Sequence, residues 1–181
     1  MRELSIANNR LRIMAATDGL TACLNRTAFA AQVDARVQPE QRAGALLIVD
    51  ADHFKRINDR VGHQAGDAAL ELIAETLRSA VRAGDIVGRL GGEEFGIFLP
   101  NIDPVAADRV AERVRLAVGE IAFIAGGKRH PLAVSIGGVV FDGSASLETL
   151  FSQADDRLYH AKQAGRNRVA MSSYVPVEAA S

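Results

Sequence analysis

The feature that most restricts the fold of this 181-residue chain is a pair of glycines between two short, mostly apolar runs. Ile86–Leu90 precedes Gly91-Gly92, and two glutamates, Glu93-Glu94, lead into Phe95–Leu99. A Gly-Gly connection between β-prone runs predicts a β-hairpin. Glycine tolerates the positive φ of a tight turn, so the glycines have a purely geometric explanation. Solvated turn acids are common, but two adjacent carboxylates at a hairpin tip also suggest metal and phosphate chemistry.

A second acidic position follows a strand that the sequence predicts to be buried. Ala45–Val49 is a continuous apolar run, typical of a strand covered on both faces, and it ends in Asp50-Ala51-Asp52. A buried carboxylate needs a cation or hydrogen-bond donors, so Asp50 needs a partner. If the strand lies beside the hairpin, Asp50 and one of the glutamates share a hard cation such as Mg²⁺. The simpler alternative is that these aspartates cap the following helix, and for Asp52 we favour it.

Helical and strand patterns alternate along the rest of the chain. The apolar spacing and the turn residues predict helices over residues 27–37 and about 63–82, a helix capped by Asp103-Pro104, and a last helix closed by Gly165. Strands are expected at 44–49, on both sides of the hairpin turn, at 132–141 with an interruption at Gly137-Gly138, and at 168–171. Since a hairpin lies among helical crossovers, we predict an α/β fold with a mixed central sheet of about five strands wrapped by helices.

The first residues carry a heptad-like apolar stripe. Leu4, Ala7, Leu11 and Met14 recur at intervals of three and four within residues 1–16. So short a helix is marginal alone, so we expect a linker helix that pairs with a copy of itself or continues an upstream element. The alternative is an amphipathic lead-in packed on its own domain. The predicted organisation is therefore a linker at 1–16, one domain at 17–171 and a loose tail at 172–181.

Composition limits the partners of the chain. A formal net charge of −1 gives no general attraction to nucleic acid or to an anionic membrane, so phosphate binding must be local. No apolar run is long enough to span a membrane, and the charged start is not a secretory signal. Cys23 is the only cysteine and is expected in the core. We expect a cytoplasmic protein that makes no direct membrane contact.

Four motifs in register resemble the GGDEF family of diguanylate cyclases. They are Asp18-Gly19-Leu20-Thr21 with Asn25-Arg26, the run Asp50–Asp59 with Gly62-His63 and Gly66-Asp67, the run Arg89–Phe95, and Tyr159–Val169. The resemblance covers residues 17–171 and implies a palm-like nucleotide cyclase fold whose hairpin carries the motif in its GGEEF form. Ala22 and Cys23 depart from the residues usual in the opening motif, but neither is a proposed ligand.

The resemblance implies an enzyme that joins two GTP molecules into cyclic di-GMP with release of pyrophosphate. Such a displacement on a polyanion needs positive charge where negative charge builds, so Mg²⁺ or Mn²⁺ is expected as cofactor. By resemblance, the side chains of Asp50 and Glu93 and the backbone carbonyl of Ala51 are metal ligands. Glu94 assists deprotonation of the attacking hydroxyl or holds a second ion.

The same resemblance assigns substrate-binding residues. Asn58 and Asp67 match the family's guanine-reading pair, and an amide with a carboxylate can read the edges of guanine. The backbone at His53, Phe54 and Lys55 is expected to donate to the phosphates, while the Phe54 side chain is expected in the core. The last two expected ligands are Lys162 and Arg166, which hold the β- and γ-phosphates from one helical turn if the last helix persists that far.

Arg82 and Asp85 match the family's product-inhibition site, in which cyclic di-GMP binds as an inhibitor. Because each fold holds one GTP, catalysis is expected to need two protomers facing across a two-fold axis, under an upstream sensory domain. Two alternatives are a non-catalytic module that senses GTP or cyclic di-GMP, and a different palm enzyme such as a mononucleotide cyclase or a polymerase. The intact acidic turn argues against the first, and the pair Asn58 and Asp67 with the missing basic surface argues against the second.

Overall fold

The computed structural model describes residues 16–37 and 43–176. The expected linker helix at 1–16 lies outside the described residues except for its last position, and so does the end of the expected tail, 177–181. The helices are α2 (Arg26–Asp34), α3 (Phe54–Val61), α4 (His63–Ala80), α5 (Pro104–Gly119) and α6 (Leu147–Gln163). The strands are β1 (Ala43–Ala51), β2 (Ile86–Gly91), β3 (Glu94–Pro100), β4 (Ile124–Ala125), β5 (Lys128–Arg129), β6 (Val134–Asp142) and β7 (Val169–Ser173).

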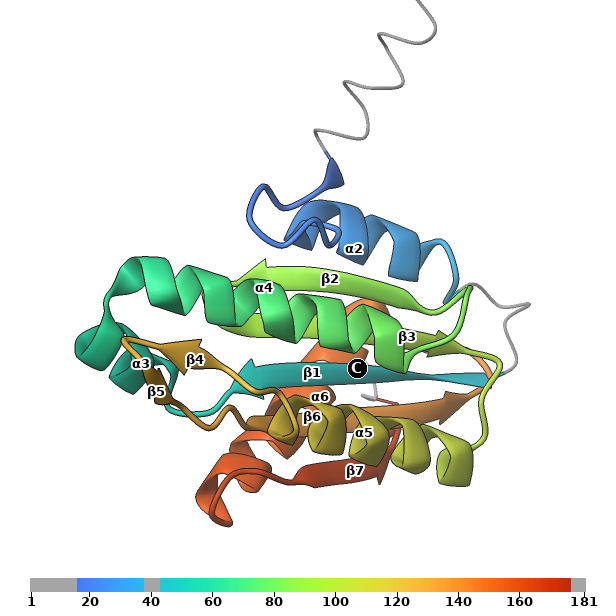
Figure 1. The fold of residues 1–181 in the computed structure, drawn as a ribbon. Helices are drawn as coiled ribbons and strands as arrows, with labels where there is room; N and C mark the ends of the chain where they lie inside the picture. Colours follow the sequence, from blue (N-terminus) through green and yellow to red (C-terminus); the bar gives the residue numbers. More distant parts are fainter. Residues whose placement is uncertain (1–15, 38–42, 177–181) are drawn as a thin grey trace, which may run out of the picture.

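A five-stranded sheet in the order β2-β3-β1-β6-β7 forms the centre of the molecule, as Figure 1 shows. The first four of these strands pair antiparallel, whereas β6 and β7 pair parallel. The sheet is therefore mixed, which confirms the sequence prediction. The predicted hairpin is also confirmed, because β2 and β3 pair across the turn at Gly91 and Gly92, both of which have positive φ.

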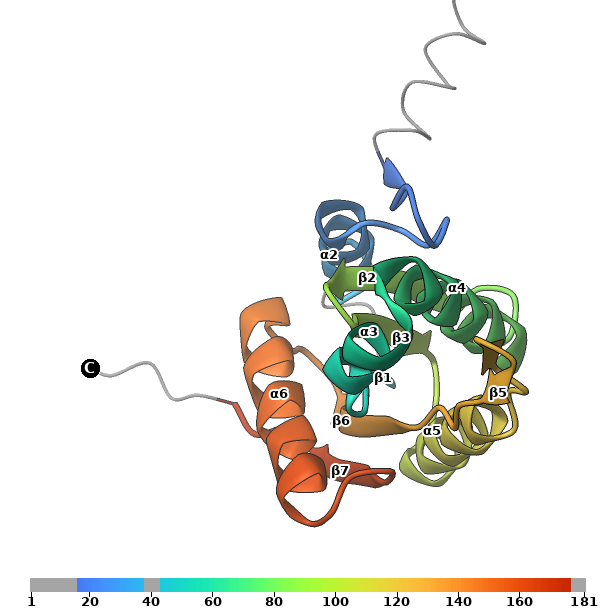
Figure 2. The same cartoon turned by 60° about the vertical axis from the view of Figure 1, so that its left-hand side comes forward.

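Helices cover both faces of the sheet, so the strands at its centre are buried on both sides (Figure 2). Helix α6 lies on the opposite face from α4 and α5. Alternate residues of β1 enter two different cores, since side chains of a strand point to opposite faces in turn. Ala45, Leu47, Val49 and Ala51 join the core under α3, α4 and α5, whereas Leu46 and Ile48 join the core under α2 and α6.

Several local predictions are confirmed. Asp103 caps α5 by accepting a hydrogen bond from the Ala106 amide, and Pro104 occupies the first turn. Gly165 follows α6 with a φ of 117°, as expected for a glycine that closes a helix. Cys23 and Phe54 are buried. Among the described residues, no helix has the length and the apolar character needed to cross a membrane.

Three predictions about the extent of helices, strands and the tail differ from the structure. Helix α2 ends at Asp34, three residues before the predicted end at 37. Strand β6 continues without interruption through Gly137-Gly138. The glycine at 137 has a different reason, because a side chain there would collide with the α6 backbone at Ala154 and Leu158. Glycine there permits close approach of the helix and does not break the strand.

Residues 172–175 are also not a loose tail. Strand β7 runs to Ser173, and the Tyr174 amide donates to the Val140 carbonyl. The Val175 amide then donates to the side chain of Gln153 on α6. These bonds tie the segment to the sheet and to α6, beyond what a local reading of the sequence predicted.

Candidate functional site

The two predicted acidic positions meet at one end of the sheet. Strands β1 and β3 pair antiparallel with Asp50 directly opposite Glu94. Side chains of directly opposed residues project from the same face of a sheet, with Cβ atoms about 5 Å apart. Asp50 is only 7% exposed, and Glu94 is partly buried. The strand end and the acidic turn therefore form one site, as the sequence predicted.

A lysine side chain supplies positive charge at this site. The Lys162 Nζ on α6 is 2.9 Å from Asp50 Oδ2. Burial raises the pKa of Asp50, Lys162 offsets part of this effect, and the charges of Glu93 and Asp52 add to it. Burial also raises the pKa of Glu94, and the charge of Asp50 raises it further. Two carboxyl groups thus lie close together with incomplete compensation of their charge.

This donor set fits a divalent cation that also binds phosphate. Mg²⁺ is commonly held by one or two carboxylates together with substrate phosphates, so it does not require an all-protein cage. Within residues 16–37 and 43–176, no group of three or more His, Cys, Asp or Glu side chains is arranged to hold a metal by itself. Asp50, Glu94 and the adjacent Glu93 offer carboxylate oxygens, and a cation bound there would offset the charge of Asp50 that raises the pKa of Glu94.

The hairpin turn is held from outside by a contact that sequence reasoning missed. Arg89 on β2 donates from Nε and Nη2 to the Gly92 carbonyl, at 3.0 and 2.8 Å. The same guanidinium pairs with Asp18 at 3.1 Å. Asp18 also accepts hydrogen bonds from the Thr21 amide and hydroxyl. Asp18 of the opening motif therefore holds the turn that carries the glutamates, through Arg89. Asp18 and Arg89 are 71 positions apart, so no local sequence pattern indicates this contact.

The start of α3 lies beside the end of β1. His53 is the N-cap residue of α3, with a φ of 56°, and its side chain makes no capping hydrogen bond. Phe54 points into the core, and His53 and Lys55 are exposed. The first turn of α3 thus has no side-chain cap, which leaves its amides suited to an anion, as predicted for this segment.

The prediction that Asp52 caps this helix is wrong. Its Oδ1 accepts from the Ser135 hydroxyl at 2.6 Å, and its Oδ2 accepts from the Asn167 amide at 2.8 Å. Both oxygens are engaged by distant elements, and the carboxylate is buried. Long-range partners therefore replaced the local capping interaction.

The expected guanine-reading residues lie on adjacent helices. Asn58 is on α3 and Asp67 is in the first turns of α4, and these two helices pack together. The Asn58 Oδ1 is the one buried side-chain polar atom without a hydrogen-bond partner among the described residues. It lies where a side chain at Gly66 would collide with it, next to the exposed Asp67. A buried unpartnered acceptor is unusual and suits a ligand that donates hydrogen bonds.

The expected phosphate-binding pair differs from the prediction in its backbone. Lys162 lies in the last turn of α6, but the helix ends at Gln163, so Arg166 is not one helical turn further along it. Arg166 lies instead in the following loop with a φ of 63°. Arg166 is exposed. Lys162 pairs with Asp50, and the next residue of the loop, Asn167, donates its amide to Asp52, so the fold and not helical spacing brings this segment to the end of β1.

Arg82 and Asp85 lie at the opposite end of the sheet, in the connection from α4 to β2 (Figure 1). They bind each other, with Arg82 Nε 3.2 Å from Asp85 Oδ1, and the Arg82 amide donates to Asp85 Oδ2. The arginine side chain is 58% exposed and the aspartate side chain 2%. They line a cavity of about 430 Å³, to which Arg36 and Arg78 also contribute.

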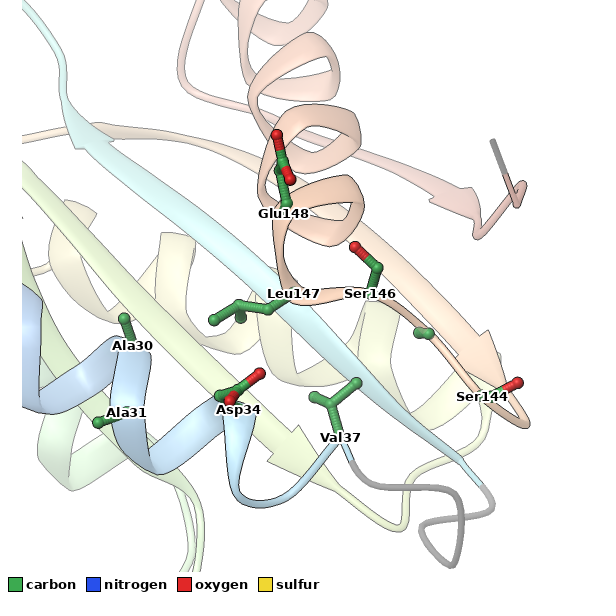
Figure 3. Close-up of a pocket in the computed structure, with 9 residues that line it drawn as sticks. Ala30, Ala31, Asp34, Val37, Ser144, Ser146, Leu147 and Glu148 are labelled. Atoms are coloured by element: carbon green, nitrogen blue, oxygen red, sulfur yellow. The ribbon is translucent and has the colours of Figure 1, made fainter. Parts of the chain in front are cut away.

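Other cavities lie away from most of these residues. One of about 720 Å³ lies between the end of α2 and the start of α6 (Figure 3). None of the sequence-predicted site residues lines it. A neighbouring cavity of about 610 Å³ shares Ala30, Leu147 and Glu148 with it and reaches Glu94. Glu94 can therefore be reached from the α2 and α6 face, whereas Asp50 behind it is buried.

Comparison with known proteins agrees with this architecture. Residues 15–168 match the family described as diguanylate cyclase, GGDEF domain. The diguanylate cyclase DgcP of Pseudomonas aeruginosa is 40% identical over 164 residues, which covers 89% of this chain and 24% of that protein. The diguanylate cyclase DgcM of Escherichia coli K12 is 42% identical over 156 residues, covering 84% of this chain and 37% of that protein. The matched segment of the chain thus spans only 24% and 37% of the length of these two curated relatives.

Solved structures give the same result for the fold. The coiled coil and GGDEF domain of DgcB from Caulobacter crescentus, solved in complex with c-di-GMP, has a TM-score of 0.89 and 28% identity. The match covers 94% of this chain and 93% of that one. The expected palm-like architecture is therefore confirmed.

Proposed function

Because the chain belongs to the GGDEF diguanylate cyclase family, we propose that it condenses two molecules of GTP into cyclic di-GMP. In this reaction the 3′-hydroxyl of each GTP attacks the α-phosphate of the other. Two phosphodiester bonds form, two α–β phosphoanhydride bonds break, and two pyrophosphates leave.

The observation that carries the proposal is the carboxyl pair of Asp50 and Glu94. The two residues face each other across β1 and β3. Burial raises the pKa values of both carboxyl groups, and the charge of Asp50 raises that of Glu94 further. Perturbed carboxyl groups of this kind gather at sites that handle charge, although structural networks also perturb pKa values. The nearby Lys162 and the uncapped start of α3 supply positive groups for a triphosphate.

Within this proposal the acidic residues hold a divalent ion, Mg²⁺ or Mn²⁺. Asp50 and Glu93 supply carboxylate oxygens, and Ala51 supplies its backbone carbonyl. A bound ion neutralises the charge that builds on the reacting phosphate. Glu94, whose raised pKa suits proton exchange nearer neutrality, accepts the proton of the attacking hydroxyl or helps to hold a second ion.

The remaining site residues bind and orient GTP. Asn58 accepts from the guanine edge through its unpartnered Oδ1, and Asp67 accepts a second hydrogen bond from the base. The amides of His53, Phe54 and Lys55 donate to the phosphates. The cations that hold the outer phosphates are Lys162, released from Asp50 when the substrate arrives, and Arg166.

The direct test is product identification by mass after incubation with GTP and Mg²⁺. Formation of cyclic di-GMP and pyrophosphate, abolished by a chelator, is the expected result. A cyclic mononucleotide would place the chain with other palm enzymes. Tight GTP binding without any product, under conditions that support dimers, would favour the non-catalytic binding module.

We further propose that two copies of the chain act together. One fold binds one GTP, so bond formation needs a second protomer across a two-fold axis. The apolar stripe of residues 1–16 is the proposed contact, under an upstream sensory domain in the cytoplasm, where GTP is available. Specific activity should then fall on dilution, and a specific activity that stays flat across dilutions would contradict the dimer.

Product inhibition at Arg82 and Asp85 is the last part of the proposal. The exposed Arg82 guanidinium, beside a cavity of about 430 Å³, suits a phosphate or a guanine edge. Added cyclic di-GMP should slow the wild-type enzyme, and Arg82→Ala should weaken this inhibition while basal turnover stays unchanged. Arg109→Ala, at an exposed arginine on α5, is the matched control. Unchanged wild-type rates at saturating product would refute the inhibitory site.

A further inference from the structure

The loop after α6 has an unusual backbone. Gly165, Arg166 and Asn167 follow one another with φ values of 117°, 63° and 45°. Residues other than glycine adopt the left-handed region at an energetic cost, because Cβ comes too close to the backbone. A succession of such residues persists only where surrounding contacts determine it. The loop must therefore be held by specific partners.

Those partners form a connected set. The Arg166 amide donates to the Ala161 carbonyl, which continues the end of α6. The Asn167 side chain accepts from Arg115 on α5 at 3.1 Å, and the Arg168 side chain donates to the Arg166 carbonyl. The buried member of the set is Asp52, whose Oδ2 accepts from the Asn167 amide.

Asp52 in turn is fixed to the sheet. Its own amide donates to the Ala133 carbonyl, and its Oδ1 accepts from the Ser135 hydroxyl on β6. A carboxylate that accepts a hydrogen bond on each oxygen from rigid neighbours has little freedom to move. The loop is thus attached to the end of β1, two residues beyond Asp50.

We propose that Asp52 is a positioning residue that holds the loop so that Arg166 reaches the outer phosphates of GTP. This inference rests on the proposed function of Arg166. The end of β1 and the residue after it then serve both parts of the site: Asp50 pairs with Lys162, and Asp52 fixes the backbone that carries Arg166. The distance between the acidic and the basic parts of the site is set by one strand end.

The chemistry of the contacts supplies a discriminating pair of variants. Asp52→Asn keeps a side-chain carbonyl oxygen for the Asn167 amide, and the new amide nitrogen can donate to the Ser135 hydroxyl, which can accept. Asp52→Ala provides neither contact. If Asp52 acts by positioning, the asparagine variant retains function and the alanine variant loses it. If its negative charge acts directly on a metal or on substrate, both variants lose function.

The readout is binding of a GTP analogue with a methylene group in place of the α,β-bridging oxygen, measured by calorimetry with Mg²⁺. The blocked leaving group keeps binding separate from condensation, so wild-type binding without cyclic di-GMP formation from GTP would refute the proposed function alone. Asp52→Ala should weaken binding roughly tenfold, as expected for one lost buried hydrogen bond. Asp52→Asn should stay within about twofold of wild type.

A double-mutant cycle with Arg166→Ala tests the coupling. Residues that act through one contact are not additive, so the double variant Asp52→Ala/Arg166→Ala should bind about as weakly as Arg166→Ala alone. Ser135→Ala is the matched control, because it removes the other partner of Asp52 and leaves the Asn167 contact. It should lower Tm with less effect on binding.

Two results would overturn the inference. One is a double variant whose loss of affinity for the analogue is the product of the two single losses. The other is an Asp52→Asn variant that binds the analogue as weakly as Asp52→Ala. Should Asp52→Ala fail to fold, hydrogen exchange of the Asn167 amide in the wild-type chain gives a separate test. This amide should be protected, and fast exchange at that position would exclude the contact in solution.

Discussion

Two acidic regions of the molecule contact the same hairpin but differ in how their charge is compensated. Asp18 pairs with Arg89 and accepts hydrogen bonds from Thr21. Burial alone would raise the pKa of Asp18, but these donors hold it below its ordinary value. Asp50 and Glu94, at the end of β1 and the start of β3, have raised pKa values because burial, together with neighbouring carboxylate charges, exceeds the effect of Lys162.

Under the proposed function, this difference separates the structural carboxylate of Asp18 from the functional carboxylates of Asp50 and Glu94. Asp18 is satisfied by the chain itself, so it stabilises the fold without needing a ligand. Asp50 and Glu94 lack sufficient positive charge, so the site gains stability when a cation or a charged ligand arrives. The direction of the pKa shift, and not the presence of a carboxylate, distinguishes the two regions.

Asp50→Asn should give the largest effect. It removes a proposed metal ligand and keeps the volume of the side chain, so cyclic di-GMP formation should fall about 1,000-fold, since metal-assisted charge stabilisation contributes several kcal/mol. Initial rates with GTP and Mg²⁺ measure it, with the exposed Asp108→Asn on α5 as control. Activity within tenfold of wild type would show that Asp50 is a structural carboxylate like Asp18, and the contrast between the two regions would not hold.

Asn58→Ala should give the next largest effect. Its Oδ1 has no partner in the described parts of the chain, so truncation breaks no internal hydrogen bond at that atom and should leave Tm nearly unchanged. The KM for GTP should nevertheless rise roughly tenfold, and the preference for GTP over ATP should fall. Gln64→Ala, at an exposed position in α4, is the matched control. An unchanged preference for GTP, or a large drop in Tm, would show that Asn58 is structural like Asp18.

Local signals were sufficient to predict much of the fold. The Gly91-Gly92 turn, the apolar run of β1 and the Asp103 cap all depend on neighbours a few residues away, and each is confirmed. Gly137 misled the prediction because its reason lies in α6, whose backbone approaches it closely. Whether a glycine within a strand interrupts the strand or allows another element to pack closely depends on tertiary contacts.

The candidate site shows the same limit. The motifs predicted its residues, but the pairing of Asp50 with Glu94 depends on the register of β1 and β3, and a slip of one residue would place the side chains on opposite faces. Asp52 was assigned to the nearest helix, whereas its partners Ser135 and Asn167 lie 83 and 115 residues away. The end of α6 before Arg166 was missed for a related reason, since contacts of the loop and not helix propensity set its conformation.

Asp18→Asn should lower stability without a direct effect on the chemistry. The uncharged asparagine weakens the pairing with Arg89, so the free energy of unfolding should fall by about 1–2 kcal/mol and Tm by about 4 °C. Because the pKa of Asp18 is lowered in the folded state, its contribution is present above about pH 4 and is lost as the pH falls. Thermal melts of the variant and the wild type should therefore differ at pH 7 and converge near pH 3. A constant difference at all pH values would mean that charge is not the cause.

Glu94→Gln should give the smallest effect and the opposite sign. The pKa of Glu94 is raised in the folded state. The wild type therefore carries no destabilisation from the Glu94 charge below about pH 4, and it loses stability as the pH rises through the raised value. The substituted glutamine carries no charge to repel Asp50, so metal-free Tm at pH 7 should rise by about 2 °C, with no difference at pH 4. Added Mg²⁺ should stabilise the wild type more than the variant at pH 7, because a bound ion removes the same repulsion. If the substitution instead lowers metal-free Tm at pH 7, Glu94 is a satisfied carboxylate, and the contrast with Asp18 does not hold.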